Sequence, residues 1–184
     1  MFKIALLLAL AGTCQSALAL ECPAVPDNVM EKDRLHAELL TTQTEMSGHA
    51  VSGQLWTIWT TAPDEASQEL LDRGRERIRV ADYEGAEQYF SDLVEYCPHY
   101  AEGWNQRAYA HHLRQDYDAS LDDINQALEL EPRHFGALAG RAITLISMGR
   151  TKIGHNALRK ALEINPWLSE RHLLPPGEES GKDI

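Results

Sequence analysis

Apolar residues recur at spacings of three and four along the central part of the chain, which is the pattern of helices that bury one face. Short polar turns such as Gln115-Asp116 and Gly149-Arg150-Thr151 interrupt this pattern. The pattern predicts six helices, over Glu65–Val80, Glu84–Tyr96, Tyr100–Arg114, Tyr117–Leu130, Phe135–Met148 and Lys152–Ile164. We therefore expect an all-α fold for this part of the chain.

The helical pattern returns with a fixed period. Pro98, Pro132 and Pro166 lie 34 residues apart, and each closes a similar phrase at the end of a predicted helix. Small residues recur four positions ahead of large apolar ones, in the pairs Ala86 and Phe90, Ser120 and Ile124, and Gly154 and Leu158. A period of this length indicates helix pairs that stack, because one pair cannot bury its apolar face alone.

The repeated phrases resemble those of the tetratricopeptide repeat family. Segments such as Asn105-Gln106-Arg107-Ala108-Tyr109 and Leu121-Asp122-Asp123-Ile124 are typical of it, and the resemblance covers roughly residues 67–167. It implies a right-handed α-superhelix, or solenoid, of three helix pairs. The three repeats would span residues 67–100, 101–134 and 135–168.

The segments on either side fit the repeat less well. Residues 20–66 form an N-terminal extension with two expected helices, one from Asn28 and one over Ala50–Thr60, with a break at Ser47-Gly48. Ser52 and Trp56 fall in the small and aromatic positions one period before the first repeat, so a degenerate repeat is one interpretation of this extension. Residues 169–184 are expected to form a short cap and a disordered tail.

Residues 1–19 have the organisation of a cleaved signal peptide. Lys3 is followed by the apolar run Ile4–Gly12 and by the small-x-small site Ala17-Leu18-Ala19. The apolar run is shorter than the ~20 residues that span a bilayer, so we expect export to the periplasm or the exterior and no membrane insertion after signal removal. The net charge of −11 argues against nucleic acid as a partner.

Two cysteines, Cys22 and Cys97, remain after removal of the signal peptide. An even number of cysteines in an oxidising compartment favours a disulfide between them. The alternative is two unpaired thiols, one near a loose terminus and one at a helix end.

In the tetratricopeptide family the first helix of each pair lines a concave groove, where partners usually bind. The resemblance implies which positions face that groove here. The candidate partner-binding residues are Arg75 and Arg79 in the first repeat, Asn105, Tyr109 and His112 in the second, and Ile143 in the third. The groove would run from cationic to apolar.

Two occupants stay open for the apolar third of the groove. The protein's own C-terminal segment around Trp167 and Leu173-Leu174 could cover it, or a partner could bind there. Some family members clamp the carboxylate tail of cytosolic chaperones with Lys, Asn and Arg in the groove. The matching positions are Leu71, Arg75, Gln106, Gly136 and Gly140, among which only Arg75 is cationic, so that pattern is absent.

Other conspicuous residues have structural explanations. The arginines that recur at one slot are expected to pair with acidic residues of the second helix, such as Asp123, rather than to bind an anion. They are Arg73, Arg107 and Arg141. His111 and His112 point about 100° apart on a helix, so they cannot bind one metal ion from one face. Trp56, Trp59 and Trp104 are expected in the core.

The sequence contains no Gly-rich phosphate-binding loop, no His-Glu-x-x-His, no Gly-x-Ser-x-Gly and no Cys-x-x-Cys motif. We therefore expect neither an enzyme nor a bound cofactor or metal. The favoured function is an exported interaction module that binds a protein or peptide partner in the groove. The alternative is a carrier or chaperone for a small ligand, haem or metal, in envelope protein maturation.

Overall fold

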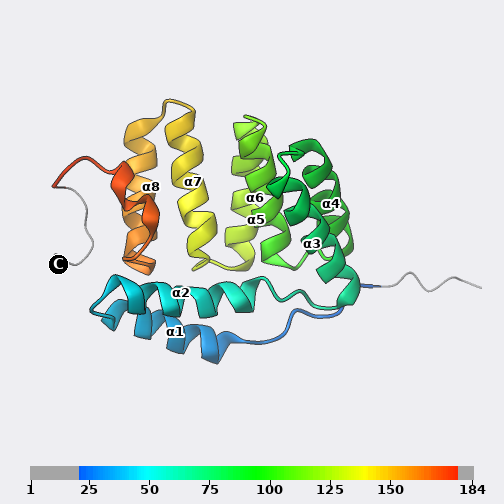
Figure 1. The fold of residues 1–184 in the computed structure, drawn as a ribbon, viewed down its shortest axis with the longest axis horizontal. Coiled ribbons are helices and arrows are strands. Elements are labelled where there is room, and N and C mark those ends of the chain that lie inside the picture. The colour runs from blue at the N-terminus through cyan, green and yellow to red at the C-terminus, as the bar shows by residue number, and fades with distance from the viewer. Residues whose placement is uncertain (1–20, 178–184) are drawn as a thin grey trace, which may run out of the picture.

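The computed structural model describes residues 21–177, so the expected signal peptide and most of the expected disordered tail lie outside the described residues. The secondary structure of the described residues consists of helices, without any strand (Figure 1). Its elements in chain order are α1 (Val29–Thr41), α2 (Glu45–Trp59), α3 (Glu65–Arg79), α4 (Tyr83–Tyr96), α5 (Ala101–Leu113), α6 (Tyr117–Leu130), α7 (Phe135–Ser147), α8 (Thr151–Ile164) and the 3-10 helix η1 (Ser169–Leu173). The all-α prediction is confirmed.

The repeat region consists of helix pairs standing side by side, α3 with α4, α5 with α6 and α7 with α8 (Figure 1). Every predicted helix boundary in this region agrees with the structure within one residue. Apolar side chains at the repeating large position are fully buried, as their spacing from the small residues predicted. These are Phe90, Ile124 and Leu158. The described part thus contains a helical solenoid of three pairs.

The turn inside each pair has the same geometry. Ala81, Gln115 and Gly149 adopt positive φ angles of 59°, 65° and 77°, and they lie 34 residues apart along the sequence. The next residue caps the following helix in the first two pairs, where the carboxylates of Asp82 and Asp116 accept hydrogen bonds from the backbone N–H of Gly85 and Ala119. The left-handed residue reverses the chain, and the aspartate starts the new helix.

Ser47 and Gly48 do not break the helix, and this prediction is wrong. Helix α2 begins at Glu45, because Thr44 and Ser47 form a capping box at its start. Gly48 lies inside α2 where a Cβ would overlap the ring of Trp167, so its role is close packing rather than termination. The chain actually turns between α1 and α2 at residues 42–44.

Helices α1 and α2 form a hairpin that lies across one end of the repeat helices instead of continuing their stack (Figure 1). Its direction does not match that of a repeat placed ahead of α3. Its apolar face shares one core with the last repeat and the segment after it. That core includes Leu35, Leu39, Leu55 and Trp59 of the hairpin, Phe135, Ala139, Leu158 and Leu162 of α7 and α8, and Trp167, Leu168 and Leu174.

Polar contacts fix the hairpin beneath the stack. The Trp167 indole N–H donates to the Thr42 hydroxyl at 2.6 Å, and the Asn165 amide donates to Ser52 at 3.0 Å. Ion pairs Lys32–Glu131 and Arg133–Asp33 join α1 to the turn between α6 and α7. The hairpin is therefore bound both to the segment after α8 and to the repeats.

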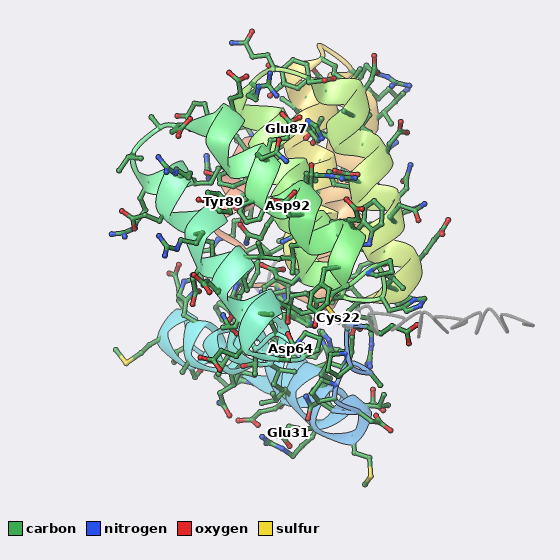
Figure 2. All side chains as sticks on the ribbon, turned by 90° about the vertical axis from the view of Figure 1, so that its right-hand side faces the viewer. Cys22, Glu31, Asp64, Glu87, Tyr89 and Asp92 are labelled. Atoms are coloured by element: carbon green, nitrogen blue, oxygen red, sulfur yellow. A yellow bond between two sulfur atoms is a disulfide. The ribbon has the colours of Figure 1, made fainter. Side chains whose placement is uncertain are left out.

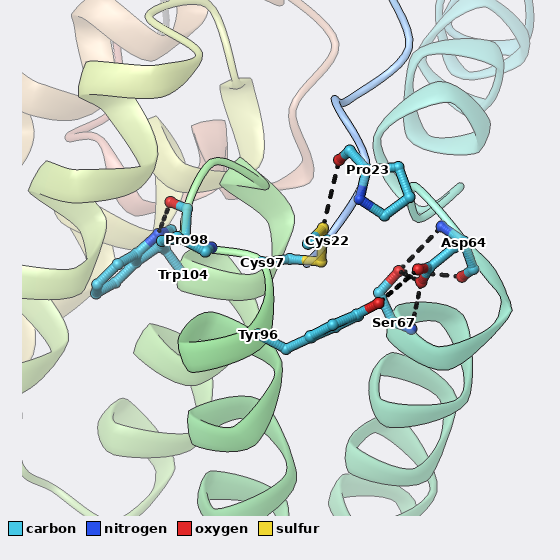
Figure 3. Close-up of a disulfide and its surroundings, with 8 residues drawn as sticks. All are labelled: Cys22, Pro23, Asp64, Ser67, Tyr96, Cys97, Pro98 and Trp104. Atoms are coloured by element: carbon cyan, nitrogen blue, oxygen red, sulfur yellow. Dashed lines mark hydrogen bonds between the residues drawn. A yellow bond between two sulfur atoms is a disulfide. The ribbon is translucent and has the colours of Figure 1, made fainter. Parts of the chain in front are cut away.

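A second core lies in the first repeat, and a disulfide connects it to the N-terminal segment (Figure 3). Cys22 and Cys97 are bonded in the structure, with their Cα atoms 5.2 Å apart. Next to them the Tyr96 hydroxyl donates to the Asp64 carboxylate at 2.8 Å. Figure 2 shows Cys22 and Asp64 between the first repeat and the hairpin that carries Glu31.

The recurring arginines differ in their partners. Arg107 forms a bidentate pair with the buried Asp123 at 2.7 and 2.8 Å, as expected. Arg73 instead pairs with Glu69 of its own exposed helix face, and Arg141 donates to Asn125 of the preceding repeat. None of the helices in residues 21–177 combines the length and apolar character needed to cross a membrane.

Candidate functional site

The structure places the candidate residues around two adjoining hollows on the side formed by α3, α5 and α7. Asn105, Tyr109, His112 and Ile143 line the first hollow, and Arg75 and Arg79 line the second together with Tyr109. Gln106 and Tyr109 line both. The six candidates thus lie along one continuous groove.

The first hollow, which we call the apolar pocket, has a volume of about 420 Å³. Its floor consists of small and aliphatic side chains on α5, α6 and α7. The floor residues include Ala108, Ile124, Ala139, Gly140 and Ile143. A pocket of this size with an apolar floor and a polar rim has the character of a ligand- or side-chain-binding site.

Two walls of the apolar pocket come from outside the repeat helices. Trp56 of α2 lies along one side, and residues 167–170 close the end next to α7. The C-terminal segment therefore covers part of the apolar third of the groove and leaves the pocket open. The C-terminal segment forms a wall of the pocket but does not fill it. The two occupants expected from the sequence, this segment and a partner, can therefore both contact the pocket.

The Trp56 wall is held in position by its neighbours. Trp59, one turn later in α2, stacks on the buried His134 ring with 4.0 Å between centroids. The Tyr100 hydroxyl donates to the Trp59 carbonyl at 2.6 Å. Burial raises the pKa of Tyr100 far above its ordinary value, so this hydroxyl stays protonated and remains a donor. The hairpin is thereby fixed to the starts of α5 and α7.

The amide groups on the rim are also held in place. The carboxylate of Glu102, which is 1% exposed, accepts from the Asn105 amide at 2.9 Å and from the Gln106 amide at 2.6 Å. It also lies 2.9 Å from Nε2 of His134. The His134 Nδ1 atom accepts from the backbone N–H of Ala137, so Nε2 carries the proton and donates to Glu102. The amide oxygens of Asn105 and Gln106 stay available to a partner.

His112 also lines the apolar pocket. Its Nδ1 atom is 3.0 Å from the hydroxyl of Thr144, which is 3.3 Å from that of Ser120. Burial lowers the pKa of His112, so the ring is neutral near pH 7 and offers hydrogen bonds rather than charge. His111 packs instead beside Asp123, with 3.5 Å between Nε2 and the carboxylate. Residues 21–177 contain no cluster of His, Cys, Asp and Glu suited to a metal ion.

The second hollow, which we call the α3 pocket, has a volume of about 480 Å³. Arg79 pairs with Glu76 at the surface, whereas Arg75 has no ion-pair partner among the described residues. Tyr109 is 49% exposed and stands between the two pockets. The groove therefore offers a cation at its α3 end and an apolar surface beyond Tyr109.

Sequence reasoning missed three contributors to the site. Trp56 was expected in the core, yet it is only partly buried and forms a pocket wall. Glu170 was not considered, although it lines the end of the apolar pocket. Gly140 was considered only as a position for a chaperone clamp. Gly140 lies four residues after Gly136, and residues four apart share one helix flank. This spacing could have indicated that Gly140 also faces the groove.

Comparisons with known proteins support the family assignment of the repeats. The tetratricopeptide repeat model matches residues 101–134. A TPR repeat-containing protein of Rhizobium etli is 27% identical over 134 residues, covering 73% of this chain and 66% of the relative. The chain therefore spans somewhat less than two thirds of that relative's length.

Solved structures of tetratricopeptide domains share the fold. The TPR domain of Arabidopsis OM64 aligns with a TM-score of 0.56 and 19% identity, covering 59% of this chain and 94% of that domain. The TPR2B-domain:pHsp70 complex of yeast Sti1 aligns with a TM-score of 0.55 and 22% identity, covering 60% of this chain and 91% of that chain. At these identities the likeness establishes a common helical architecture and no more.

Proposed function

Because one repeat matches the tetratricopeptide model and the repeat region has that fold, we propose that this chain is an interaction module that binds a polypeptide in its concave groove. The observation that carries the proposal is the continuous groove formed by the apolar pocket and the α3 pocket. The Sti1 domain with a similar fold is in complex with pHsp70, which supports a polypeptide as the class of partner.

The groove is unsuited to the chaperone-tail mode of some family members. Of the positions that correspond to that clamp, Leu71 is fully buried, and Gly136 is covered by the Trp56 ring. Arg75 is their single cation. A partner here would use apolar contact and a few hydrogen bonds with Asn105 and Gln106 rather than a ring of cationic donors.

The first test removes two exposed side chains of the groove, Arg75 at its α3 end and Tyr109 between the two pockets. We expect Arg75→Ala with Tyr109→Ala to weaken partner binding by roughly 2–4 kcal/mol, because Arg and Tyr dominate binding hot spots. The fold should persist, since both side chains face solvent. The measurement is capture of partners from an envelope extract, followed by titration calorimetry with the captured polypeptide.

The matched control is Arg73→Ala with Tyr89→Ala. It removes the same residue types from a hollow on the other side of α3 and α4, where Figure 2 labels Tyr89. The control should bind normally. Normal binding by the Arg75 and Tyr109 variant, with an unchanged circular dichroism spectrum, would place the binding site outside the groove and contradict the proposal.

We place this module in the periplasm or outside the cell, on the strength of the signal-peptide pattern in residues 1–19. A disulfide between Cys22 and Cys97 agrees with an oxidising compartment. Fractionation of cells that produce the full chain should recover a shortened protein from the envelope. Recovery of the full-length chain from the cytoplasm would contradict this part of the proposal.

A second candidate is a carrier of a small apolar ligand such as haem. One observation favours it, since about 420 Å³ falls within the range of small-molecule sites. The protein would then be purified with a bound chromophore, or would bind haem stoichiometrically in an absorbance titration. A colourless protein that shows no spectral shift with haem would leave the polypeptide partner as the function.

A further inference from the structure

Helix α7 has two glycines, Gly136 and Gly140, that are one turn apart on the flank facing the groove. A Cβ at Gly136 would overlap the ring of Trp56, so this protein's own indole covers the backbone there. Trp56 also meets Phe135 edge to face, with 5.6 Å between ring centroids. The flank of α7 therefore accepts a large flat apolar side chain laid against glycine.

Gly140 has no such cover among the described residues. A Cβ at this position would meet only the Ile124 Cδ1 atom, at an ordinary contact distance of 3.7 Å. Ala139 and Ile143 flank it, and all three line the apolar pocket. We call this uncovered backbone the Gly140 gap. It has the same chemistry as the place that Trp56 fills, one helical turn away.

Each end of the groove has a charged side chain without an ion-pair partner among the described residues, and the two side chains have opposite signs. Arg75 in the α3 pocket has no ion-pair partner among the described residues, whereas Asp72 accepts a hydrogen bond from Gln68 and Glu76 pairs with Arg79. At the other end Glu170 accepts only from its neighbour Ser169 among the described residues. Asp72, Glu76 and Arg79 also line the α3 pocket, but the apolar pocket has no Asp, Glu, Lys or Arg in its lining other than Glu170. Arg75 and Glu170 are therefore charges of opposite sign, at opposite ends of the groove, with which one bound segment can pair.

The geometry points to an occupant of defined chemistry: a polypeptide segment with a bulky aliphatic or aromatic side chain in the Gly140 gap, a carboxylate at Arg75 and a cationic side chain at Glu170. This inference rests on the proposed function and adds the class of segment recognised. A segment with two acidic flanks would lose its contact at Glu170, and one with two basic flanks would lose its contact at Arg75.

The test uses fluorescent peptides with blocked ends, a central Leu and Gly-Ser spacers of several lengths. Four versions carry one Lys and one Glu, two Lys, two Glu or two Gln as flanks, and binding is measured by anisotropy at low salt. We expect the mixed peptide to bind about two- to fivefold tighter than the others, since each exposed ion pair contributes little. Because a peptide can bind in either direction, composition rather than order is compared.

Charge reversals then move the preference in predictable directions. Arg75→Glu should make the two-Lys peptide the best ligand, and Glu170→Lys should make the two-Glu peptide the best. Arg73→Glu is the matched control, because it makes the same change on the outer side of α3. An order of preference that stays the same in both groove variants, or equal binding of the mixed and two-Gln peptides by the parent protein, overturns the inference.

The Gly140 gap is tested separately with Gly140→Leu, which should reduce binding of all four peptides at least about tenfold by filling the pocket. Gly140→Ala serves if the larger side chain unfolds the protein, and Gly53→Ala, on the exposed side of α2, is the control.

Normal peptide binding by Gly140→Leu, together with loss of binding in the Arg75 and Tyr109 variant, rejects the inference and keeps the proposed function. Normal binding of every peptide and of the captured partner by both variants rejects both. A parent protein that binds its captured partner in the groove but none of the peptides also rejects the inference.

Discussion

At the scale of single residues, His36 is an imidazole buried in the hairpin without a hydrogen-bond partner on either ring nitrogen among the described residues. Burial lowers its pKa to about 4, and Arg133 acts in the same direction. In the unfolded chain the ring titrates near its ordinary value of about 6.5. Between these values only the unfolded chain gains the proton, so the free energy of unfolding decreases as the pH falls from about 6.5 to 4.

We therefore expect His36→Phe to stabilise the protein more, relative to the parent, at about pH 5 than at about pH 8. Phe keeps the ring against Trp59 and cannot be protonated. Urea denaturation at the two pH values measures the difference. The same increment at both pH values would show that His36 does not titrate in this way.

The left-handed turn residues allow a second prediction at this scale. An L-residue at positive φ costs about 1 kcal/mol or more, and two of the turns place Ala81 and Gln115 there while the third has Gly149. Ala81→Gly should therefore raise the free energy of unfolding by up to about 1 kcal/mol, and Gly149→Ala should lower it by about as much. Thermal unfolding of the two single variants should show shifts of opposite sign, and shifts of the same sign would contradict the explanation.

At the scale of elements, α8 lacks the cap that starts the equivalent helices α4 and α6. Asp82 and Asp116 cap those helices, but Arg150 stands at the same position of the third repeat and makes no side-chain cap. We expect Arg150→Asp to stabilise the protein by about 1 kcal/mol. Lys152→Asp is the control, because it brings the same charge to the first turn without reaching the cap position. Equal effects of the two changes in urea denaturation would attribute the gain to charge alone.

The repeat helices could be predicted almost to the residue because their signals are local and occur three times. The turn, the helix cap and the spacing from small to large residues each depend on residues within one period. Asp82 and Asp116, which cap α4 and α6, are examples. The position of α1 and α2 could not be predicted from the sequence, because their contacts join residues far apart in it. Ser52 meets Asn165, and Thr42 meets Trp167, and no periodicity connects these pairs.

The same distinction applies to the candidate site. The six residues named from the repeat register line one groove because the register fixes their helix face. The walls formed by Trp56 and Glu170 come from segments outside the repeats. Ser47-Gly48 was misread as a break for a related reason, since the packing partner that explains Gly48 is Trp167.

At the scale of the whole molecule, the disulfide closes a loop of 75 residues between the N-terminal segment and the first repeat. In the chain-entropy model such a loop is worth about 4 kcal/mol. We expect reduction of the parent protein to lower the free energy of unfolding by about that amount. The double variant Cys22→Ser with Cys97→Ala should have the lower stability from the start and should not respond to a reductant.

Thiol titration of the denatured, unreduced protein provides the complementary check. Almost no free thiol is expected after removal of the signal peptide, because Cys22 and Cys97 are the cysteines that remain. Two free thiols per chain would show that the bond does not form in the cell.

The shared core of the hairpin and the last repeat also affects the order in which the chain can fold as it emerges, N-terminus first, into its final compartment. Leu35, Leu39 and Leu55 emerge early, but their partners Leu158, Leu162 and Trp167 follow more than 100 residues after Leu55. An ordinary repeat array can fold unit by unit as it emerges. Here the earliest helices stay unprotected until the last ones arrive, so completion of the native state is a late, single event.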